Sequence, residues 1–200
     1  MSDKIKVDLP SILARISYPN IFTPRAPQGT DIPKFSASFL IPKNDPVNNT
    51  IQQAIASIQD QVNKKKGGNI HLNLFKYVAA ENDPSYGANY AEYNVLSAGS
   101  KQEYPPLVVD QSRSPVIDQS LIYAGCWVHA KILLMHTETG SQRIIAALNG
   151  IMFHSDGERL DSRPDADTMF GDIAGAPPPM AAAPAAAPAA APGTYSNMLS

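Results

Sequence analysis

The chain has 200 residues, a net charge of −2 and a hydrophobic fraction of 44%, which are ordinary values for a globular protein with one domain. Its single cysteine, Cys126, excludes an intramolecular disulfide framework and a zinc site built from cysteines. No stretch is apolar enough to span a membrane, and no apolar leader segment is present. We therefore expect a cytoplasmic protein that is not secreted and has no membrane partner.

Charge is distributed unevenly along the chain. From residue 156 to the end, six acidic and two basic side chains give −4, which leaves 14 basic and 12 acidic side chains, or +2, for residues 1–155. A mildly basic body followed by an acidic segment favours an anionic ligand, with which the segment can compete. Further on, an Ala/Pro repeat predicts an extended spacer, because a proline at every fourth residue interrupts a helix. We expect a domain over residues 1–163 and a disordered tail over residues 164–200, first acidic and then rich in Ala and Pro.

The first third of the chain predicts two strands. Residues 11–18 alternate loosely, with Tyr18 on the apolar side and Arg15 on the other. Residues 34–41 alternate more clearly. Between them, residues 20–33 contain three prolines and a glycine, which predicts a loop.

One helix follows the second strand. Asp45 provides an N-cap and Pro46 a first-turn residue, and apolar side chains then recur at three- and four-residue steps as far as Val62. The helix ends with the lysines at 64–66 and Gly67. Basic residues before a glycine are typical of a helix C terminus, and a phosphate-binding patch is the alternative interpretation.

The rest of the domain reads as further strands separated by Gly- and Pro-rich turns. The last two are expected to pair as a hairpin, with a bulge at Asn149 and Gly150. Mostly short strands with one helix predict an OB-like five-stranded barrel with extra strands and loops, in which the helix commonly lies between strands three and four. The further strands are expected over residues 70–78, 90–98, 107–110, 121–135 and 143–153.

The strand predicted over residues 121–135 carries the richest set of functional side chains. One of its faces is entirely apolar, and the other presents Tyr123, Trp127, His129 and Lys131. A spacing of two residues sets such side chains in a row at steps of roughly 6–7 Å. Aromatic rings that stack on bases and cations that neutralise phosphates are how proteins bind single-stranded nucleic acid. The alternative is that Tyr123 and Trp127 fill a second hydrophobic layer.

Other strands contribute weaker candidates for nucleic-acid binding. Four are basic side chains on apparent strands, where a solvated role is the alternative, and two are tyrosines beside basic or polar neighbours, where burial is the alternative. These candidates are Arg15, Lys34, Lys76, Arg143, Tyr77 and Tyr93.

The sequence does not point to an enzyme. The four histidines lack metal-ligand spacing, and neither a phosphate-binding glycine loop nor a nucleophile elbow is present. Asp156, Glu158 and Asp161 crowd together as the acids of a metal-dependent nuclease do, but they fall in a turn, where a solvated acidic segment is the simpler interpretation. We expect no catalytic residue, no metal and no cofactor.

Five segments within residues 10–163 together resemble a family of bacteriophage single-stranded DNA-binding proteins with an OB fold. Their order and spacing carry the resemblance more than any one of them does. The segments are RISYPNIFTP, KFSASFLIPKND, YNVLSAGSKQEYPPLVVDQSRSPVID, YAGCWVHAKILL and ALNGIMFHSDGERL.

The resemblance implies a protein of the host cytoplasm that coats and protects single-stranded DNA in phage replication and recombination, without sequence preference. It also implies an acidic tail that competes with DNA and recruits replication or recombination proteins. Here the acids end at Asp172, and the Ala/Pro stretch and the final TYSNMLS that follow are not acidic. The alternative is a phage structural or adaptor module that binds protein partners through the same barrel. Nothing in the sequence indicates an oligomeric state.

Overall fold

The computed structural model describes residues 5–160, except residues 28, 87 and 139–141. The predicted boundary at residue 163 and the predicted tail lie outside this part of the chain. No helix among the described residues is long and apolar enough to cross a membrane. The elements are β1 (Lys6–Asp8), β2 (Ile12–Arg25), β3 (Lys34–Pro42), α1 (Val47–Lys66), β4 (Tyr77–Ala79), β5 (Tyr93–Lys101), β6 (Leu107–Val109), β7 (Trp127–Thr137) and β8 (Arg143–Ser155), with short 3-10 helices at Ala80–Asn82, Ala88–Tyr90 and Gln119–Leu121.

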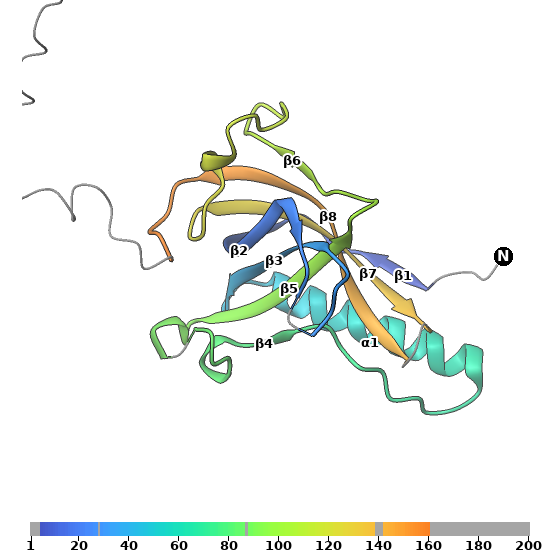
Figure 1. Cartoon of the computed structure of the whole chain (residues 1–200). Coiled ribbons are helices and arrows are strands. Elements are labelled where there is room, and N and C mark those ends of the chain that lie inside the picture. Colours follow the sequence, from blue (N-terminus) through green and yellow to red (C-terminus); the bar gives the residue numbers. More distant parts are fainter. Residues whose placement is uncertain (1–4, 28, 87, 139–141, 161–200) are drawn as a thin grey trace, which may run out of the picture. The chain divides into compact units, whose positions relative to one another are not determined.

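Five strands close into a barrel (Figure 1). β3 pairs with β2 and β5, and β7 pairs with β2 and β8, all antiparallel. A parallel contact between Gly99 of β5 and Ala147 of β8 completes the ring. β1, β4 and β6 add to β7, β5 and β8 outside it. The predicted mostly-β barrel with extra strands is confirmed, but α1 follows the second barrel strand rather than the third.

The inward faces of the barrel strands and one face of α1 share a single hydrophobic core. Ile16, Phe39 and Ile132 from the barrel are completely buried, and so are Ile51 and Ile58 from α1, which runs beneath the barrel in Figure 1. Each such side chain contributes about 1.5–3 kcal/mol by leaving water. The apolar face predicted for residues 122–134 belongs to this core, apart from the half-buried Ala124.

The predicted loop over residues 20–33 is wrong in its first part, because β2 continues to Arg25. Its pairing with β3 shifts register twice, between Ser17 and Asn20 and between Asn20 and Arg25. Each shift contains a proline, Pro19 or Pro24. Proline has no N–H to give to a sheet, so a bulge lets the strand pass it and continue.

The central strand begins at Trp127 rather than at residue 121. Gly125 turns the chain before it, with φ of +113°, and a Cβ at this position would lie only 2.0 Å from the carbonyl oxygen of Glu158. Tyr123 is therefore not part of β7. The strand predicted over residues 70–78 is also too long, since only β4 forms a named strand there, and Asn73 before it makes an isolated bridge with Arg143.

The hairpin and its bulge are confirmed. β7 pairs antiparallel with β8, and the register passes from Lys131 opposite Gly150 to Ile132 opposite Leu148, which leaves Asn149 as the extra residue. The predicted helix is also confirmed. Its first assigned residue is Val47, whose N–H donates to the Asp45 carboxylate at 2.8 Å.

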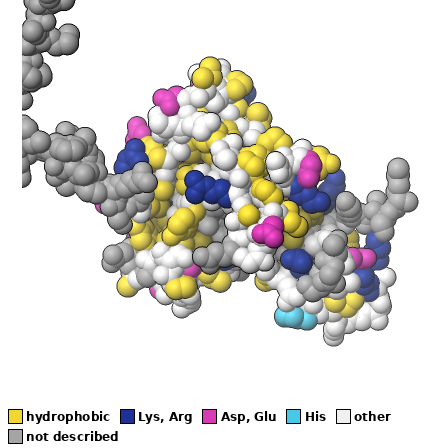
Figure 2. All heavy atoms as spheres, in the orientation of Figure 1, with side chains coloured by type: hydrophobic (Ala, Val, Ile, Leu, Met, Phe, Trp, Pro, Cys, Tyr) yellow, Lys and Arg dark blue, Asp and Glu magenta, His cyan; other side chains and the backbone are white. Residues whose placement is uncertain are grey.

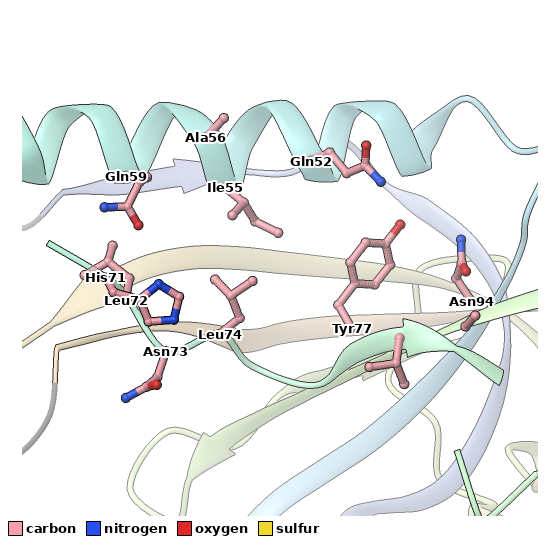
Figure 3. Close-up of a pocket in the computed structure, with 12 residues that line it drawn as sticks. Gln52, Ile55, Ala56, Gln59, His71, Leu72, Asn73, Leu74, Tyr77 and Asn94 are labelled. Carbon is pink, nitrogen blue, oxygen red and sulfur yellow. The ribbon is translucent and has the colours of Figure 1, made fainter. Parts of the chain in front are cut away.

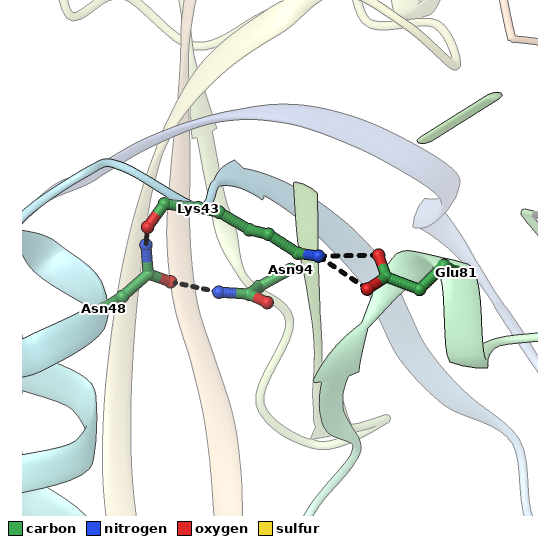
Figure 4. Close-up of polar contacts among 4 residues, drawn as sticks. All are labelled: Lys43, Asn48, Glu81 and Asn94. Atoms are coloured by element: carbon green, nitrogen blue, oxygen red, sulfur yellow. Dashed lines mark hydrogen bonds and ion pairs between the residues drawn. The ribbon is translucent and has the colours of Figure 1, made fainter. Parts of the chain in front are cut away.

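A buried amide joins α1 to three other elements. Asn48 donates to the carbonyl oxygen of Pro42 at 2.8 Å and accepts from the Tyr77 hydroxyl at 2.7 Å and from Asn94 at 3.0 Å. Figure 4 shows Asn48 and Asn94 beside the ion pair of Lys43 with Glu81. The amide thus links the helix start with the end of β3 and with β4 and β5.

We expect Asn48→Ala to lower the free energy of unfolding by about 2 kcal/mol or more, because buried polar partners lose their hydrogen bonds. Urea denaturation measures the change. Asn49→Ala is the matched control, since Asn49 is the next helical residue and is exposed. Equal effects of the two substitutions would contradict the role assigned to Asn48.

Asp83 makes stability depend on pH. Burial by itself raises the pKa of its carboxyl, but the hydrogen bond from the Lys76 ammonium and the Ser85 N–H outweigh burial, and the pKa is lowered. The folded state therefore holds this proton less tightly than the unfolded state does. The stabilisation is fully present above the ordinary carboxyl pKa of about 3.9 and is lost as pH falls through the lower folded value.

We expect Asp83→Asn to destabilise the protein at pH 7 and the difference from the unsubstituted protein to shrink as pH falls below about 4. Urea denaturation at several pH values measures this trend. Asp31→Asn, at an exposed acid, is the control. A difference that stays constant down to pH 3 would show that the Asp83 charge is not responsible.

Candidate nucleic-acid interface

Basic and small polar side chains gather on the outer surface of β2, β3 and β5. Phe35, Ala37 and Phe39 of β3 are buried, the last two within the main hydrophobic core, so the alternate residues point outward. Residues that pair across neighbouring strands lie side by side on the same face. We call this surface the three-strand face, and its members are Ser17, Asn20 and Arg25 of β2, Lys34, Ser36 and Ser38 of β3, and Ser97, Gly99 and Lys101 of β5.

One end of the three-strand face carries a row of three cations. Lys34 pairs directly with Arg25 on one side and with Lys101 on the other. All three side chains are exposed, and none forms an ion pair with an acid among the described residues. Like charges placed directly opposite one another destabilise a sheet. An anionic ligand would relieve that repulsion.

A hollow of about 680 Å³ lies beside this row. Its lining includes Lys34 and Lys101, and it adds Lys76, Arg143 and the aromatic Phe75, with Glu103 as an acidic member. Three of the predicted basic candidates therefore meet here. Figure 2 shows Lys and Arg side chains on the face in view, among hydrophobic groups and with several Asp and Glu side chains on the same face. The charge of Lys76 is partly neutralised within the protein, because its ammonium pairs with the Asp83 carboxylate.

The middle of the three-strand face is lined by small residues, which we call the serine floor. They are Ser17, Ser36, Ser38, Ser97 and Gly99. Ser38 and Ser97 share a hydrogen bond of 2.9 Å between their hydroxyls. Ser36 pairs with Gly99, where an added Cβ would lie 2.7 Å from the Phe35 carbonyl oxygen. A floor without large side chains lets a flat or extended ligand approach the strands closely.

The other end of the face carries tyrosines. Tyr86 makes edge-to-face contacts with Tyr18 and Tyr90, at centroid distances of 6.2 and 5.7 Å. Burial raises the pKa of Tyr86, and the hydroxyls of Ser17 and Ser38 oppose this effect, so the phenol borders the serine floor. The Tyr86 hydroxyl has no hydrogen-bond partner of good geometry among the described residues. The predicted candidate Tyr93 packs, half-buried, near this group.

The four side chains predicted to form an open row around β7 are held in separate contacts instead. Trp127 lies against Gly157, and the His129 ring makes an edge-to-face contact with His154 at 4.9 Å. Burial and this second histidine lower the pKa of His129. Lys131 donates to the Leu9 carbonyl oxygen at 2.6 Å.

Tyr123 and Arg15 hold the segment that follows β8. The Tyr123 hydroxyl accepts from the Gly157 N–H at 3.0 Å and donates to its carbonyl oxygen at 2.9 Å, and the Arg159 guanidinium lies 4.4 Å from the ring centroid. Arg15 is buried and donates to the carbonyl oxygens of Gly125 and Glu158. We call residues 156–160 the clamp segment. Arg15 was expected on the more polar face, and its guanidinium is instead occupied inside the protein.

A second cleft, of about 630 Å³, lies between α1 and residues 71–79 (Figure 3). Ile55 and Leu74 face one another across it, and Tyr77 and Asn94 close one end. Its lining contains no lysine or arginine among the described residues. The cleft therefore lacks the charge that a polyanion needs, and Tyr77, another predicted candidate, uses its hydroxyl to bind Asn48.

A metal centre receives no support from the described residues, which contain no group of three His, Cys, Asp or Glu side chains close enough to hold an ion. The Asp156 carboxylate lies 3.1 Å from the Tyr123 hydroxyl, whose one proton it shares with the Gly157 carbonyl oxygen. Asp161, the third acid of the nuclease interpretation, lies outside the described residues.

Of the residues predicted from the sequence, Lys34, Lys76 and Arg143 lie on or beside the three-strand face, and sequence reasoning did not single out Arg25, Lys101 or the tyrosines at 18 and 86 that also lie there. Arg25 was placed in a loop, and Lys101 lay beyond the predicted end of its strand. Charge alone singled out neither residue. Their common feature is the register of three strands, which the linear pattern does not contain.

Comparison with known proteins gives a consistent result. A putative protein, p50, of Acyrthosiphon pisum secondary endosymbiont phage 1 is 29% identical in an alignment of 153 residues that covers 72% of this chain and 81% of p50. The structure of the single-stranded DNA-binding protein from bacteriophage Enc34 in complex with ssDNA is similar, with a TM-score of 0.63 and 25% identity over 80% of this chain and 90% of that one.

A more distant likeness is to gp2.5, a single-stranded DNA-binding protein encoded by bacteriophage T7. It has a TM-score of 0.57 and 14% identity, over 85% of this chain and 94% of gp2.5, and so shows a shared fold. The family described as Enterobacter phage Enc34, ssDNA-binding protein, matches residues 5–177. Since that match spans the whole barrel, this chain belongs to the Enc34 family of phage single-stranded DNA-binding proteins.

Proposed function

We propose that this protein binds single-stranded DNA on the three-strand face, without sequence preference, and so coats and protects it during phage replication and recombination. The observation that carries the proposal is the row of Arg25, Lys34 and Lys101 across three neighbouring strands. Membership of a family of ssDNA-binding proteins supports the same ligand.

The charges around the row suit a chain of phosphates. Three exposed cations stand in line across the strands, and Arg143 and Lys76 continue the positive lining of the neighbouring hollow. Each phosphate that a cation neutralises releases counterions, so affinity falls as salt rises, with a slope of about −0.7 per contact for single strands. Contacts to phosphates are the same for every sequence, which accounts for binding without sequence preference.

The remaining predicted candidates belong to the scaffold in this proposal. Arg15 and Tyr123 hold the clamp segment, and Trp127, His129 and Lys131 of the predicted platform lie on β7, beyond the three-strand face. The relatives are ssDNA-binding proteins, and we propose that this chain likewise performs no catalysis. We also propose that residues 161–200, which lie outside the described structure, recruit replication or recombination proteins.

We expect the double substitution Lys34→Gln with Lys101→Gln to weaken binding to oligo-dT about tenfold or more at 50 mM salt. The slope of log affinity against log salt should become shallower by about 1.4, because two phosphate contacts are lost. Fluorescence anisotropy of a labelled oligonucleotide measures both values.

The matched control for this experiment is Lys6→Gln with Lys64→Gln. It removes the same charge at two exposed lysines, on β1 and at the end of α1. It should lower the affinity only slightly. Equal losses in the two double variants would mean that net charge matters and the three-strand face does not.

We expect removal of residues 161–200 to tighten binding at low salt, with the gain disappearing at high salt. These residues hold four acids and one base, a charge of −3, and a polyanionic strand and an acidic segment compete for the same cations. The truncation begins after Leu160 so that the clamp segment keeps its contacts with Arg15 and Tyr123.

A full-length variant with the four acids of residues 161–200 replaced by Asn or Gln separates charge from length. It should bind as tightly as the truncated chain. If both variants bind oligo-dT no more tightly than the unsubstituted protein at 50 mM salt, the acidic segment does not compete with DNA.

A further inference from the structure

We infer that the tyrosine end of the three-strand face is a base-stacking site and that Tyr18 is the residue that contacts the base. The inference rests on the proposed function and adds to it that phosphates and bases bind at different ends of the face. Phosphates are held at the basic row, and a base of the same strand is held at the tyrosines.

Tyr18 has a backbone conformation that is rare for a large side chain. Its φ is +48°, a left-handed value that bulky L residues rarely adopt, and among the described non-glycine residues only Arg113 shares this feature. The strain occurs in the first bulge of β2, between Ser17 and Asn20. An alternating strand would have turned Tyr18 toward the side of Ile16, which is buried. The bulge leaves the tyrosine side chain 58% exposed instead.

A strained backbone that exposes a large aromatic side chain is typical of a binding residue. The bulge at Pro19 turns the ring outward, and its exposed surface is apolar area that burial would otherwise make stabilising. The single edge-to-face contact with Tyr86 covers at most one face of the Tyr18 ring. Tyr86 in turn makes an edge-to-face contact with Tyr90. The cluster is therefore a supported aromatic surface rather than a loose side chain.

The tyrosines and the basic row share one surface. Ser17, which precedes Tyr18, pairs with Ser38, and Ser38 pairs with Ser97. Along β3, the residues from Lys34 to Ser38 span roughly 13 Å at about 3.3 Å per residue. The serine floor fills this interval. A single strand of a few nucleotides can therefore lie across the floor, with its phosphates near Lys34 and a base against Tyr18.

Stacking on Tyr18 can be separated from phosphate binding by comparing oligo-dT with an abasic strand of the same length. Both strands carry the same phosphates, but only oligo-dT offers bases. The unsubstituted protein should bind oligo-dT more tightly than the abasic strand. Tyr18→Gly should lower affinity for oligo-dT about 5- to 100-fold, as the loss of one stacked base does, and change affinity for the abasic strand less than about twofold.

Glycine is chosen because it adopts φ of +48° without strain, so the variant loses the ring and not the backbone geometry. Tyr18→Asn is the second variant, since Asn also tolerates this conformation and its amide cannot replace the ring. Tyr18→Phe keeps the ring and should bind both strands as the unsubstituted protein does. Arg113→Gly relieves the same kind of strain elsewhere and should leave the ratio of the two affinities unchanged. Thermal denaturation identifies which variants are folded.

Loss of the preference for oligo-dT in a folded Tyr18→Gly or Tyr18→Asn variant, with an unchanged salt slope, supports the inference. An unchanged preference in either folded variant overturns it and leaves the proposed function intact. Failure of the unsubstituted protein to bind either strand at low salt overturns the proposed function itself.

Discussion

The pairing of β3 with β2 on one side and β5 on the other is the constraint on which the candidate interface depends. It sets Lys34 between two further cations and Ser38 between two further serines. A shift of one residue would turn every side chain of β3 to the opposite face, placing Phe35 and Phe39 in water and the lysine in the core. The hydrophobic core therefore holds the register, and the register builds the basic row as a consequence.

Bulges and close backbone contacts interrupt this regular strand pairing in β2 and at the turn before β7. The first bulge in β2 lets the strand pass Pro19 and turns Tyr18 outward. Behind β2, Gly125 allows the clamp segment to approach the barrel, and Arg15 donates to backbone carbonyl oxygens on both sides of that contact. The described part of the chain therefore ends, at Leu160, in an anchored segment.

The division between scaffold and surface differs from the one that residue types suggested. Tryptophan, histidine and tyrosine around β7 have the chemistry for binding a single strand, and in the structure they contact Gly157, His154 and backbone groups. The exposed cations on the strand ends have fewer internal contacts. Availability of a side chain, and not only its type, decides whether it can bind a ligand.

Local sequence patterns were enough to predict most of the elements, the helix that begins after Asp45, the β7–β8 hairpin with its bulge, the barrel class and, through resemblance, the family. These features depend on local periodicity and on turn residues, which a linear pattern contains. Only the tertiary structure decided that β2 continues beyond Pro19, that Arg15 is buried, and that Arg25, Lys34 and Lys101 align. Those outcomes depend on strand register and on contacts between residues far apart in the chain. Alternation of apolar and polar residues predicts the face of the strand on which a residue lies, but not which residue of a neighbouring strand lies beside it.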